Sequence, residues 1–352
     1  MVGALREPST MSDLGLPAWD RLIPLARRAN LLARLAWLVG HHRLQVPREV
    51  EPHLRSARYL AERQQRVILW EVEQIARALA PLECPVVLLK GAAYVMAGLE
   101  VAGGRLFGDV DILLPRERLD EAERLLRYEG WFSHHHDDYD QRYYRRWMHE
   151  LPPLRHLRRG TVLDVHHNIL PLTSPLCPDI GPLVDDSRPL PAAPGEVRVP
   201  SPVDMVIHSA THLFQEGEFD NAFRDLVDLH LLLEEFGADP GFHAALLERT
   251  ERFGLWRPLY YALRYVHRML ETPIPDTVLE VLYREGRPRG RVAMMDALFG
   301  RALLPLYRVI DTPLSGVSRK LLYVRAHRLR MPWHLLIPHL ARKAMRGRED
   351  AV

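Results

Sequence analysis

Two acidic residues within one short hydrophobic run constrain this chain more than any other feature of its sequence. The run Gly108–Leu114 alternates acidic and apolar residues, with a Gly-Gly pair shortly before it and Pro115 directly after it. This pattern predicts a β-strand that begins after a turn. Successive side chains of a strand point to opposite faces, so Asp109 and Asp111 are expected on one face and the apolar residues on the other, towards a core.

Two carboxylates on one face of a strand repel each other, and this repulsion destabilises their ionised forms unless a cation lies between them. Mg²⁺ prefers hard oxygen ligands and is usually held by one or two carboxylates together with substrate phosphates. We therefore expect Asp109 and Asp111 to bind magnesium. The alternative is a pair of solvent-facing acids on an edge strand.

A turn suited to phosphate is predicted upstream of the acids. The apolar run 86–89 predicts a buried strand, and Lys90, Gly91 and Ala92 lead from it into a helical pattern. Free backbone N–H groups at the start of a helix favour a phosphate. The charge of Lys90 either neutralises a triphosphate or pairs with Asp109.

A third acid follows on another predicted strand. Residues 161–167 again carry an acid between apolar residues, which places Asp164 and His166 on one face. Acids from two strands beside a phosphate-compatible turn can hold a pair of metal ions over a triphosphate. Asp164 is therefore the third predicted metal ligand. His166, on the same face, is expected to border the pocket for a second substrate, the acceptor of a transferred group.

The order of these segments resembles that of a known family, the uncharacterised nucleotidyltransferases of the DNA polymerase β-like superfamily. Members of the superfamily share a glycine motif that begins a helix, an Asp-x-Asp strand and a third acid on a later strand. The segments that carry the resemblance are, in order, Leu89-Lys90-Gly91, Arg105, Asp109-Val110-Asp111-Ile112-Leu113 and Leu163-Asp164-Val165-His166.

The resemblance implies an enzyme that transfers a nucleoside monophosphate from an NTP, ATP by default, to an unidentified hydroxyl acceptor and releases pyrophosphate. It implies two Mg²⁺ ions and assigns the phosphate-binding turn to Gly91. The usual Gly-Ser of the superfamily is Gly91-Ala92 here, so a hydroxyl that contacts phosphate is missing. Two other functions remain open: a phosphotransferase acting on a small molecule or peptide, and a non-catalytic protein that binds a nucleotide or a partner.

Two arginines are predicted nucleotide contacts. Arg105 lies in the glycine-rich turn before the acids, where it is placed to meet a phosphate. The family pattern also has an Arg-x-x-x-Asp helix, which implies that Arg224 faces the nucleotide. The alternative for Arg224 is an ion pair with Asp228, four residues further along the same helix.

Composition limits the remaining possibilities. The formal net charge is +2 with many charges of both signs, so the chain has no general polyanion-binding signature and needs no nucleic acid. Its two cysteines are too few for a disulfide framework, which fits a reducing cytoplasm. No apolar run is long enough to span a membrane. Abundant Arg, Ala, Leu and Pro suggest a GC-rich bacterial genome.

The pattern along the chain predicts an α+β fold. A small mixed β-sheet nucleotidyltransferase core is expected to be flanked by N-terminal helices and a C-terminal helical domain. Further strands are expected at 131–132, within 142–158 and near 197–199, and Ser201 is a candidate N-cap. The predicted divisions are an N-terminal helical segment (1–80), the core (81–170), a proline-rich connector (171–200) and the C-terminal helical domain (201–352).

Three other features have competing interpretations. His208 and His212 have a spacing that can serve a metal, but partly buried, hydrogen-bonded histidines are the favoured interpretation. The cluster 134–138, with three histidines and two aspartates, is expected to be a solvated loop. The basic C-terminal segment, with Arg319, Lys320 and Arg325 among its charges, is either a packed helix with a solvated basic face or a tail that contacts an anionic surface.

Overall fold

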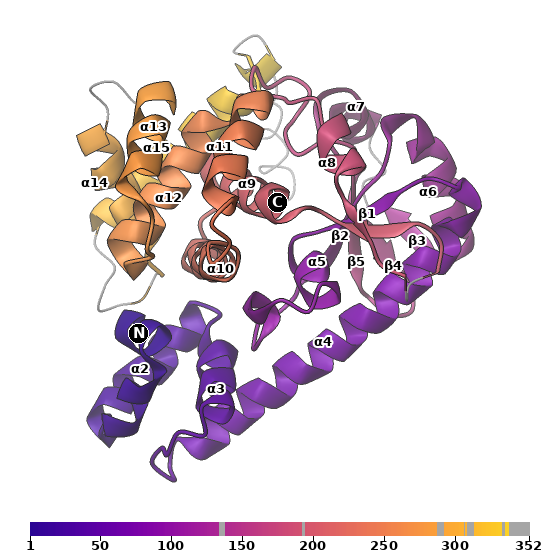
Figure 1. Cartoon of the computed structure of the whole chain (residues 1–352). Helices are drawn as coiled ribbons and strands as arrows, with labels where there is room; N and C mark the ends of the chain where they lie inside the picture. Colours follow the sequence, from indigo (N-terminus) through magenta and orange to yellow (C-terminus); the bar gives the residue numbers. More distant parts are fainter. Residues whose placement is uncertain are drawn as a thin grey trace, which may run out of the picture.

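A computed structural model describes residues 1–133, 138–191, 194–286, 292–305, 307, 313–332 and 335–337. A mixed seven-stranded sheet lies on the right of Figure 1, with the C-terminal helices at the upper left and the first N-terminal helices at the lower left. The predicted α+β fold class is confirmed. Within these ranges no helix is both long enough and apolar enough to cross a membrane.

The acidic strand lies inside the sheet. The strands are β1 (Val86–Leu89), β2 (Asp109–Leu113), β3 (Trp131–Ser133), β4 (Leu154–His156), β5 (Val162–His166), β6 (Arg188–Pro189) and β7 (Val197–Val199). Their order is β3-β4-β5-β2-β1-β7-β6, with β2 parallel to β5 and antiparallel to β1. The alternative that placed the acids on an edge strand is therefore wrong.

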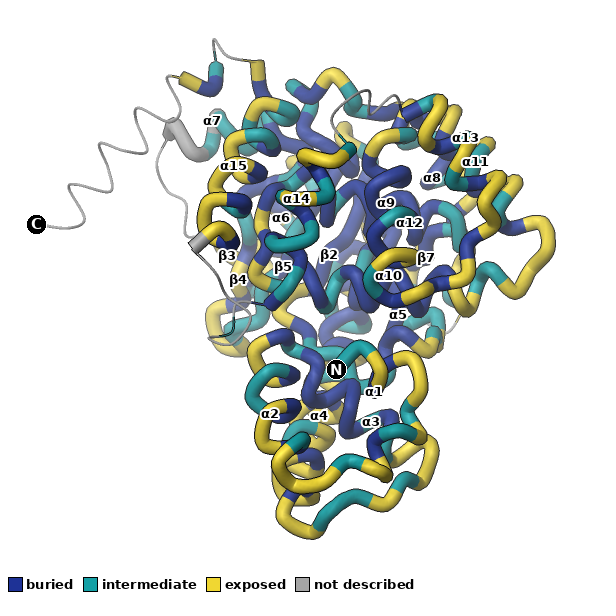
Figure 2. The backbone as a smooth tube through the Cα atoms, turned by 90° about the vertical axis from the view of Figure 1, so that its left-hand side faces the viewer, coloured by how far each residue is buried: buried dark blue, intermediate teal, exposed yellow. Residues whose placement is uncertain are grey.

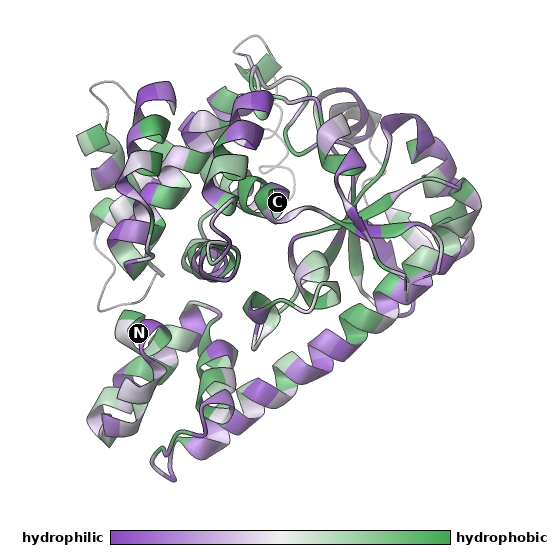
Figure 3. Ribbon diagram, in the orientation of Figure 1, coloured by the Kyte–Doolittle hydropathy of each residue, from purple (hydrophilic) through white to green (hydrophobic). Residues whose placement is uncertain are grey.

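Burial of apolar side chains explains β1 and β2. All four residues of β1 are buried, and β2 buries Val110 and Ile112 as predicted. The central strands are accordingly mostly hydrophobic in Figure 3. Asp111 is also buried, at 3% exposure, whereas Asp109 is exposed. The two carboxylates therefore occupy different environments, which the alternating pattern alone did not predict.

The predicted N-terminal helices are present and are separated by short breaks. These elements are α1 (Val2–Arg6), η1 (Pro8–Asp13), α2 (Leu16–Arg28), α3 (Leu32–His41), α4 (Glu51–Leu79) and η2 (Ala80–Leu82). Asn30, with φ of 56°, adopts the left-handed conformation that ends a helix and separates α2 from α3. Helix α4 extends from the N-terminal helices to the sheet (Figure 1).

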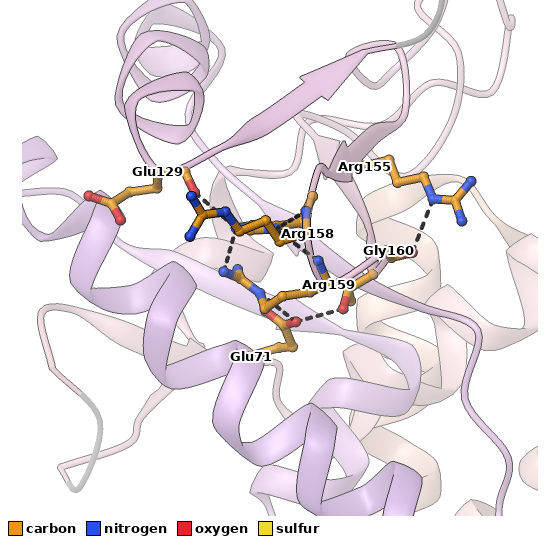
Figure 4. Close-up of polar contacts among 8 residues, drawn as sticks. Glu71, Glu129, Arg155, Arg158, Arg159 and Gly160 are labelled. Carbon is orange, nitrogen blue, oxygen red and sulfur yellow. Dashed lines mark hydrogen bonds and ion pairs between the residues drawn. The ribbon is translucent and has the colours of Figure 1, made fainter.

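A buried carboxylate joins α4 to the strands of the sheet (Figure 4). Glu71, only 1% exposed, accepts hydrogen bonds from Nε of Arg159 at 2.9 and 3.1 Å and from the hydroxyl of Thr161 at 2.6 Å. Arg159 also contacts His156 of β4. Because Arg159 and Thr161 lie in the turn between β4 and β5, this network fixes the turn against α4.

Helices fill most of the chain between β1 and β4, and the last of them lies where a strand was expected. The elements here are α5 (Lys90–Met96), η3 (Glu100–Ala102), η4 (Arg116–Arg118), α6 (Leu119–Tyr128) and α7 (Asp138–Trp147). The prediction of strands within 142–158 is right only for β4 and wrong for 142–147. Tyr143 and Trp147 have a high strand propensity, but at a spacing of four residues their rings pack edge to face on α7. The cluster 134–138 lies mainly outside the described residues.

The proline-rich segment 171–200 contributes to the sheet. It contains the short helix α8 (Gly181–Asp185) and the strands β6 and β7. The predicted strand near 197–199 is confirmed as β7, which pairs parallel to β1. This segment therefore connects the sheet to the C-terminal helices through hydrogen-bonded strands.

Helix α9 is the most buried of the C-terminal elements and appears dark blue at the centre of Figure 2. Ser201 caps it as predicted, because its hydroxyl accepts the backbone N–H of Asp204. The C-terminal helices are α9 (Pro202–Gln215), α10 (Ala222–Phe236), α11 (Phe242–Phe253), α12 (Trp256–Leu270), α13 (Asp276–Gly286), α14 (Val292–Ala302) and α15 (Pro313–Arg330).

Candidate functional site

The parallel pairing of β2 and β5 brings the predicted acids together. Asp111 and Asp164 are direct register partners on adjacent strands, and Asp109 lies two residues before Asp111. Asp109 is exposed, Asp164 is partly buried and Asp111 is buried. The three carboxylates thus form a cluster that runs from the surface into the sheet.

Asp111 is the charged centre of the cluster. Its Oδ1 accepts hydrogen bonds from Nζ of Lys90 at 2.8 Å and from Nε2 of His166 at 3.1 Å. Burial by itself raises the pKa of Asp111, but Lys90 and His166 outweigh burial and hold that pKa well below its ordinary value. Asp111 is therefore ionised and already has two cationic or hydrogen-bonding partners.

The other two acids are held less readily in their charged forms. Burial, followed by the charge of Asp111, raises the pKa of Asp164 to about 7. The charge of Asp111, followed by burial, also raises the pKa of Asp109. A nearby cation would lower the pKa of both carboxyl groups, because it stabilises their ionised forms.

Lys90 has a carboxylate partner, but not the one that the sequence suggested. It pairs with Asp111 rather than with Asp109. Burial lowers the pKa of Lys90, but the charge and hydrogen bond of Asp111 together with the charge of Glu216 outweigh burial, so the net shift is upward and the amine stays protonated. Lys90 also has φ of 46°, a left-handed conformation at the junction of β1 and α5.

Gly91 and Ala92 are both buried at the start of α5. A Cβ atom on Gly91 would lie 2.5 Å from Nη1 of Arg105 and 2.8 Å from the ring of Phe107. Glycine is therefore required here because the Arg105 side chain crosses directly over it. A role of these two residues in phosphate binding stays a prediction.

Arg105 and Arg224 each have a carboxylate partner. Nε of Arg105 lies 2.8 Å from Oδ2 of Asp228 on α10, and both side chains are largely buried. Arg224 pairs with the adjacent Asp225, at 2.6 Å. The suggested ion pair of Arg224 with Asp228 is therefore wrong, since Asp228 is bound to Arg105.

Helix α9 contributes a second set of charged groups. Nδ1 of His212 lies 2.7 Å from Oε1 of Glu216 at the end of the helix. Burial raises the pKa of Glu216, but His212 and then Lys90 outweigh burial and hold that pKa well below its ordinary value. His208 is buried, which lowers its pKa well below the ordinary value and keeps the ring neutral. His212 is partly buried and paired with Glu216, so for this residue the geometry agrees with the favoured interpretation of a partly buried histidine with a polar partner.

Two residues next to the acids carried no signal in the sequence. Glu150 forms an isolated β-bridge with His166, and its Oε2 lies 3.3 Å from Nδ1 of that ring. His149 is buried beside them, with its ring 5.3 Å from the ring of His166. Neither residue lies in a periodic pattern or in a recognisable motif, so only the fold places them here.

The donor set fits a divalent cation. Oδ1 of Asp164 is buried and has no hydrogen-bond partner among the residues that the structure describes. An unpaired buried acceptor is unfavourable unless a cation or a ligand satisfies it. Together with oxygens of Asp109 and Asp111, it offers the hard ligands that Mg²⁺ prefers.

The described part of the basic C-terminal segment is packed against the protein. Nη1 of Arg325 on α15 donates to the carbonyl of Phe214 at 3.0 Å, and its guanidinium lies over the ring of Phe299. Arg319 lies 3.5 Å from Asp220. Residues 338–352 lie outside the described ranges, so contact of this tail with an anionic surface stays a prediction.

Comparison with known proteins identifies the family of this chain. The family model described as "Uncharacterised nucleotidyltransferase" matches residues 17–271, a range that contains every carboxylate and cation of the site described above. No curated protein and no solved structure matched the chain. Because the matched range is more than half of the chain, the protein belongs to the uncharacterised nucleotidyltransferase family.

Proposed function

We propose that this protein transfers a nucleoside monophosphate from an NTP to a hydroxyl-bearing acceptor, releases pyrophosphate and requires divalent metal. The observation that carries the proposal is the pairing of Asp111 with Asp164 across β2 and β5, with Asp109 beside them. A structural role explains this cluster poorly, because grouping the three acids raises the pKa of Asp109 and of Asp164 and so disfavours their ionised forms. A bound cation would explain why the three acids lie together, because it stabilises their ionised forms.

In the proposed site Asp109, Asp111 and Asp164 would hold two Mg²⁺ ions, which would supply positive charge to the triphosphate and to the pyrophosphate leaving group. Asp111 is ionised before any ion binds, because Lys90 and His166 stabilise its charge. Its ionised state prepares the site for a cation without the loss of a proton.

Asp164 is the proposed general base. Its pKa of about 7 applies to the metal-free protein. With metal bound, a carboxylate oxygen beside the acceptor can take up the hydroxyl proton as the acceptor oxygen attacks. The acceptor oxygen attacks the α-phosphorus in line, the bond to the β-phosphate oxygen breaks, and pyrophosphate departs. His166, two residues further along β5, is proposed to border the acceptor pocket.

The remaining cations are proposed to contact the nucleotide. Lys90 lies beside the acids, and the charge of Arg105 is close enough to lower the pKa of Asp109 in part. To bind a phosphate directly, Arg105 and Arg224 must exchange their present carboxylate partners for it. Gly91 and Ala92 would supply backbone N–H groups at the start of α5.

The test measures pyrophosphate release and the mass of the product. Purified protein with Mg²⁺ and each of the four NTPs, ATP first, is supplied with candidate acceptors, and products are identified by mass spectrometry. Addition of a nucleoside monophosphate supports the proposal, addition of a phosphate indicates a phosphotransferase, and nucleotide binding without any addition indicates a non-catalytic binder.

Variants separate the site from the fold. Asp109→Asn and Asp111→Asn should each abolish turnover, whereas Asp164→Asn should retain nucleotide binding and lose transfer by roughly the 10²- to 10⁴-fold associated with a general base. The matched control is Asp20→Asn, the same change at an exposed position on α2. Normal transfer by Asp164→Asn would exclude the three-carboxylate mechanism.

A further inference from the structure

His149, Glu150 and His166 form a cluster next to the three acids, and one ligand atom from each lies within 4.8 Å of the other two. We propose that this cluster binds one divalent transition-metal ion of the Zn²⁺ type, at a site separate from the magnesium proposed above. Four independent features of the cluster support this assignment: its backbone anchoring, the hydrogen bonds of His166, the unpaired ring nitrogen of His149 and the chemistry of the ligands.

Backbone hydrogen bonds fix the cluster before any ion binds. Glu150 and His166 face each other in an antiparallel bridge. The N–H of His167 donates to the carbonyl of His149 at 2.7 Å, and the N–H of Leu151 donates to the carbonyl of a β5 residue at 2.8 Å. The ligand-bearing segment is therefore held along β5, so that little conformational entropy is lost when a metal ion binds.

The hydrogen bonds of His166 are those of a metal ligand. A metal-binding histidine usually donates its second ring N–H to a carboxylate, which fixes the orientation of the ring. Nε2 of His166 lies 3.1 Å from Oδ1 of Asp111, which leaves Nδ1 for the ion. Nδ1 lies 3.3 Å from Oε2 of Glu150. Two ligands about 2.0–2.1 Å from a tetrahedral zinc ion are about 3.3 Å apart.

His149 supplies an unsatisfied donor atom. The residue is 5% exposed, and its Nδ1 has no hydrogen-bond partner within the described part of the chain. A buried polar atom without a partner is destabilising, and coordination of an ion removes that cost. Coordination through Nδ1 of His149 would therefore break no existing hydrogen bond of that nitrogen.

Ligand type distinguishes this site from the magnesium site. Two imidazoles and one carboxylate suit Zn²⁺ and related transition ions, whereas Mg²⁺ prefers oxygen ligands alone. Three protein ligands also leave a coordination position open. Because His166 bridges to Asp111, an ion here fixes the ring that hydrogen-bonds the central carboxylate and so acts as a positioning ion for the active site.

The first experiment measures binding without nucleotide or turnover. Untagged protein stripped with a chelator is titrated calorimetrically with Zn²⁺ in excess Mg²⁺, and separately with Co²⁺ while visible absorption is recorded. We expect one equivalent of Zn²⁺ to bind and Co²⁺ to give the intense bands of an ion with nitrogen ligands and a low coordination number. Absence of Zn²⁺ binding would leave His166 as a ring that only bridges Asp111 and Glu150 and would overturn the proposal.

Variants locate the ion. His149→Ala and the isosteric Glu150→Gln should each weaken Zn²⁺ binding by more than the roughly 10- to 100-fold typical of an outer-shell partner. His53→Ala, which removes an exposed histidine of α4, should leave binding unchanged. Circular dichroism in chelator identifies any variant that fails to fold, and Glu150→Gln preserves shape where His149→Ala does not. Unchanged affinity in both folded variants would refute the site.

Asp109→Asn distinguishes this inference from the proposed function. The variant should lose nucleotidyl transfer and keep its equivalent of Zn²⁺, because Asp109 is not a ligand of the transition-metal site. If Asp109→Asn removes Zn²⁺ binding, the ion occupies the three-acid cluster and the separate site does not exist. If Zn²⁺ binds as expected but no acceptor is modified, the metal site stands and the proposed transfer activity fails.

Discussion

The raised pKa of Asp164 predicts a stability change that depends on pH. Burial, together with the charge of Asp111, raises this pKa from 3.8 to about 7. The folded protein therefore binds a proton at Asp164 more tightly than the unfolded chain does, so the folded state is destabilised as pH rises from about 4 to 7. Replacement by asparagine removes this destabilisation, and Asp164→Asn should be more stable than the wild type in metal-free buffer at high pH.

The magnitude follows from the size of the pKa shift. A shift of about three pH units at roughly 1.4 kcal/mol per unit sets a ceiling of about 4 kcal/mol. Water reaches part of this carboxylate, so we expect Asp164→Asn to gain about 2–4 kcal/mol at pH 8 and little at pH 4. Magnesium should reduce the difference, because a bound cation stabilises the ionised carboxylate of the wild type.

The assay is urea denaturation of both proteins in chelator at several pH values, with Asp20→Asn as the matched control. The expected result is a difference in the free energy of unfolding that grows with pH for Asp164→Asn and stays flat for the control. An equal difference at pH 4 and pH 8 would refute the reasoning, since the effect would then not come from ionisation of Asp164.

Three further predictions concern the contacts around the site. Glu71→Gln should destabilise the protein by about 2–4 kcal/mol in denaturation, somewhat below the roughly 3–5 kcal/mol for a fully buried pair because Arg159 is 25% exposed. The same change at Glu73, whose side chain is 45% exposed, should cost less than about 1 kcal/mol. Lys90→Gln leaves buried Asp111 without its ammonium partner, so unfolding should become easier without metal and Mg²⁺ should restore more stability than it adds to the wild type; equal responses would contradict this. Gly91→Ala should cost about 1–3 kcal/mol through overpacking, and an unchanged denaturation midpoint would show that its neighbours move freely.

The positions of the three acids were predictable because they depend on local alternation. A period of two residues places Asp109 and Asp111 on one face, and the same pattern places Asp164 and His166 on another strand. That these two strands pair with each other was not predicted from the sequence. Their actual register, with Asp111 opposite Asp164, is a property of the folded sheet.

The partners of the charged residues were not predictable. Arg105 and Asp228 are separated by 123 positions along the chain, and no pattern within either segment connects them. The suggested pair of Arg224 with Asp228 relied on helical spacing, which is correct as geometry but competes with a partner from another element. Sequence periodicity determines which face a side chain occupies, whereas the choice among several oppositely charged partners depends on tertiary packing.

His149 and Glu150 illustrate the same limit for a binding site. They follow α7 in a short segment without periodicity, within the range 142–158 where strands were expected. Their position results from an isolated bridge to His166, which is a contact between segments rather than a local preference. A histidine and an acid next to each other occur in many surface loops, so the pair alone has little predictive value.

The pairing of β7 with β1 has a consequence for the order in which the chain can fold during synthesis. β1 lies between β2 and β7, so until residue 199 has left the ribosome one side of this apolar strand has no partner. An exposed strand edge can pair with other chains and promotes aggregation. A nascent or truncated product that ends near residue 170 would carry all three acids and still expose this edge, so chaperone demand should be greatest while residues 171–199 are being made.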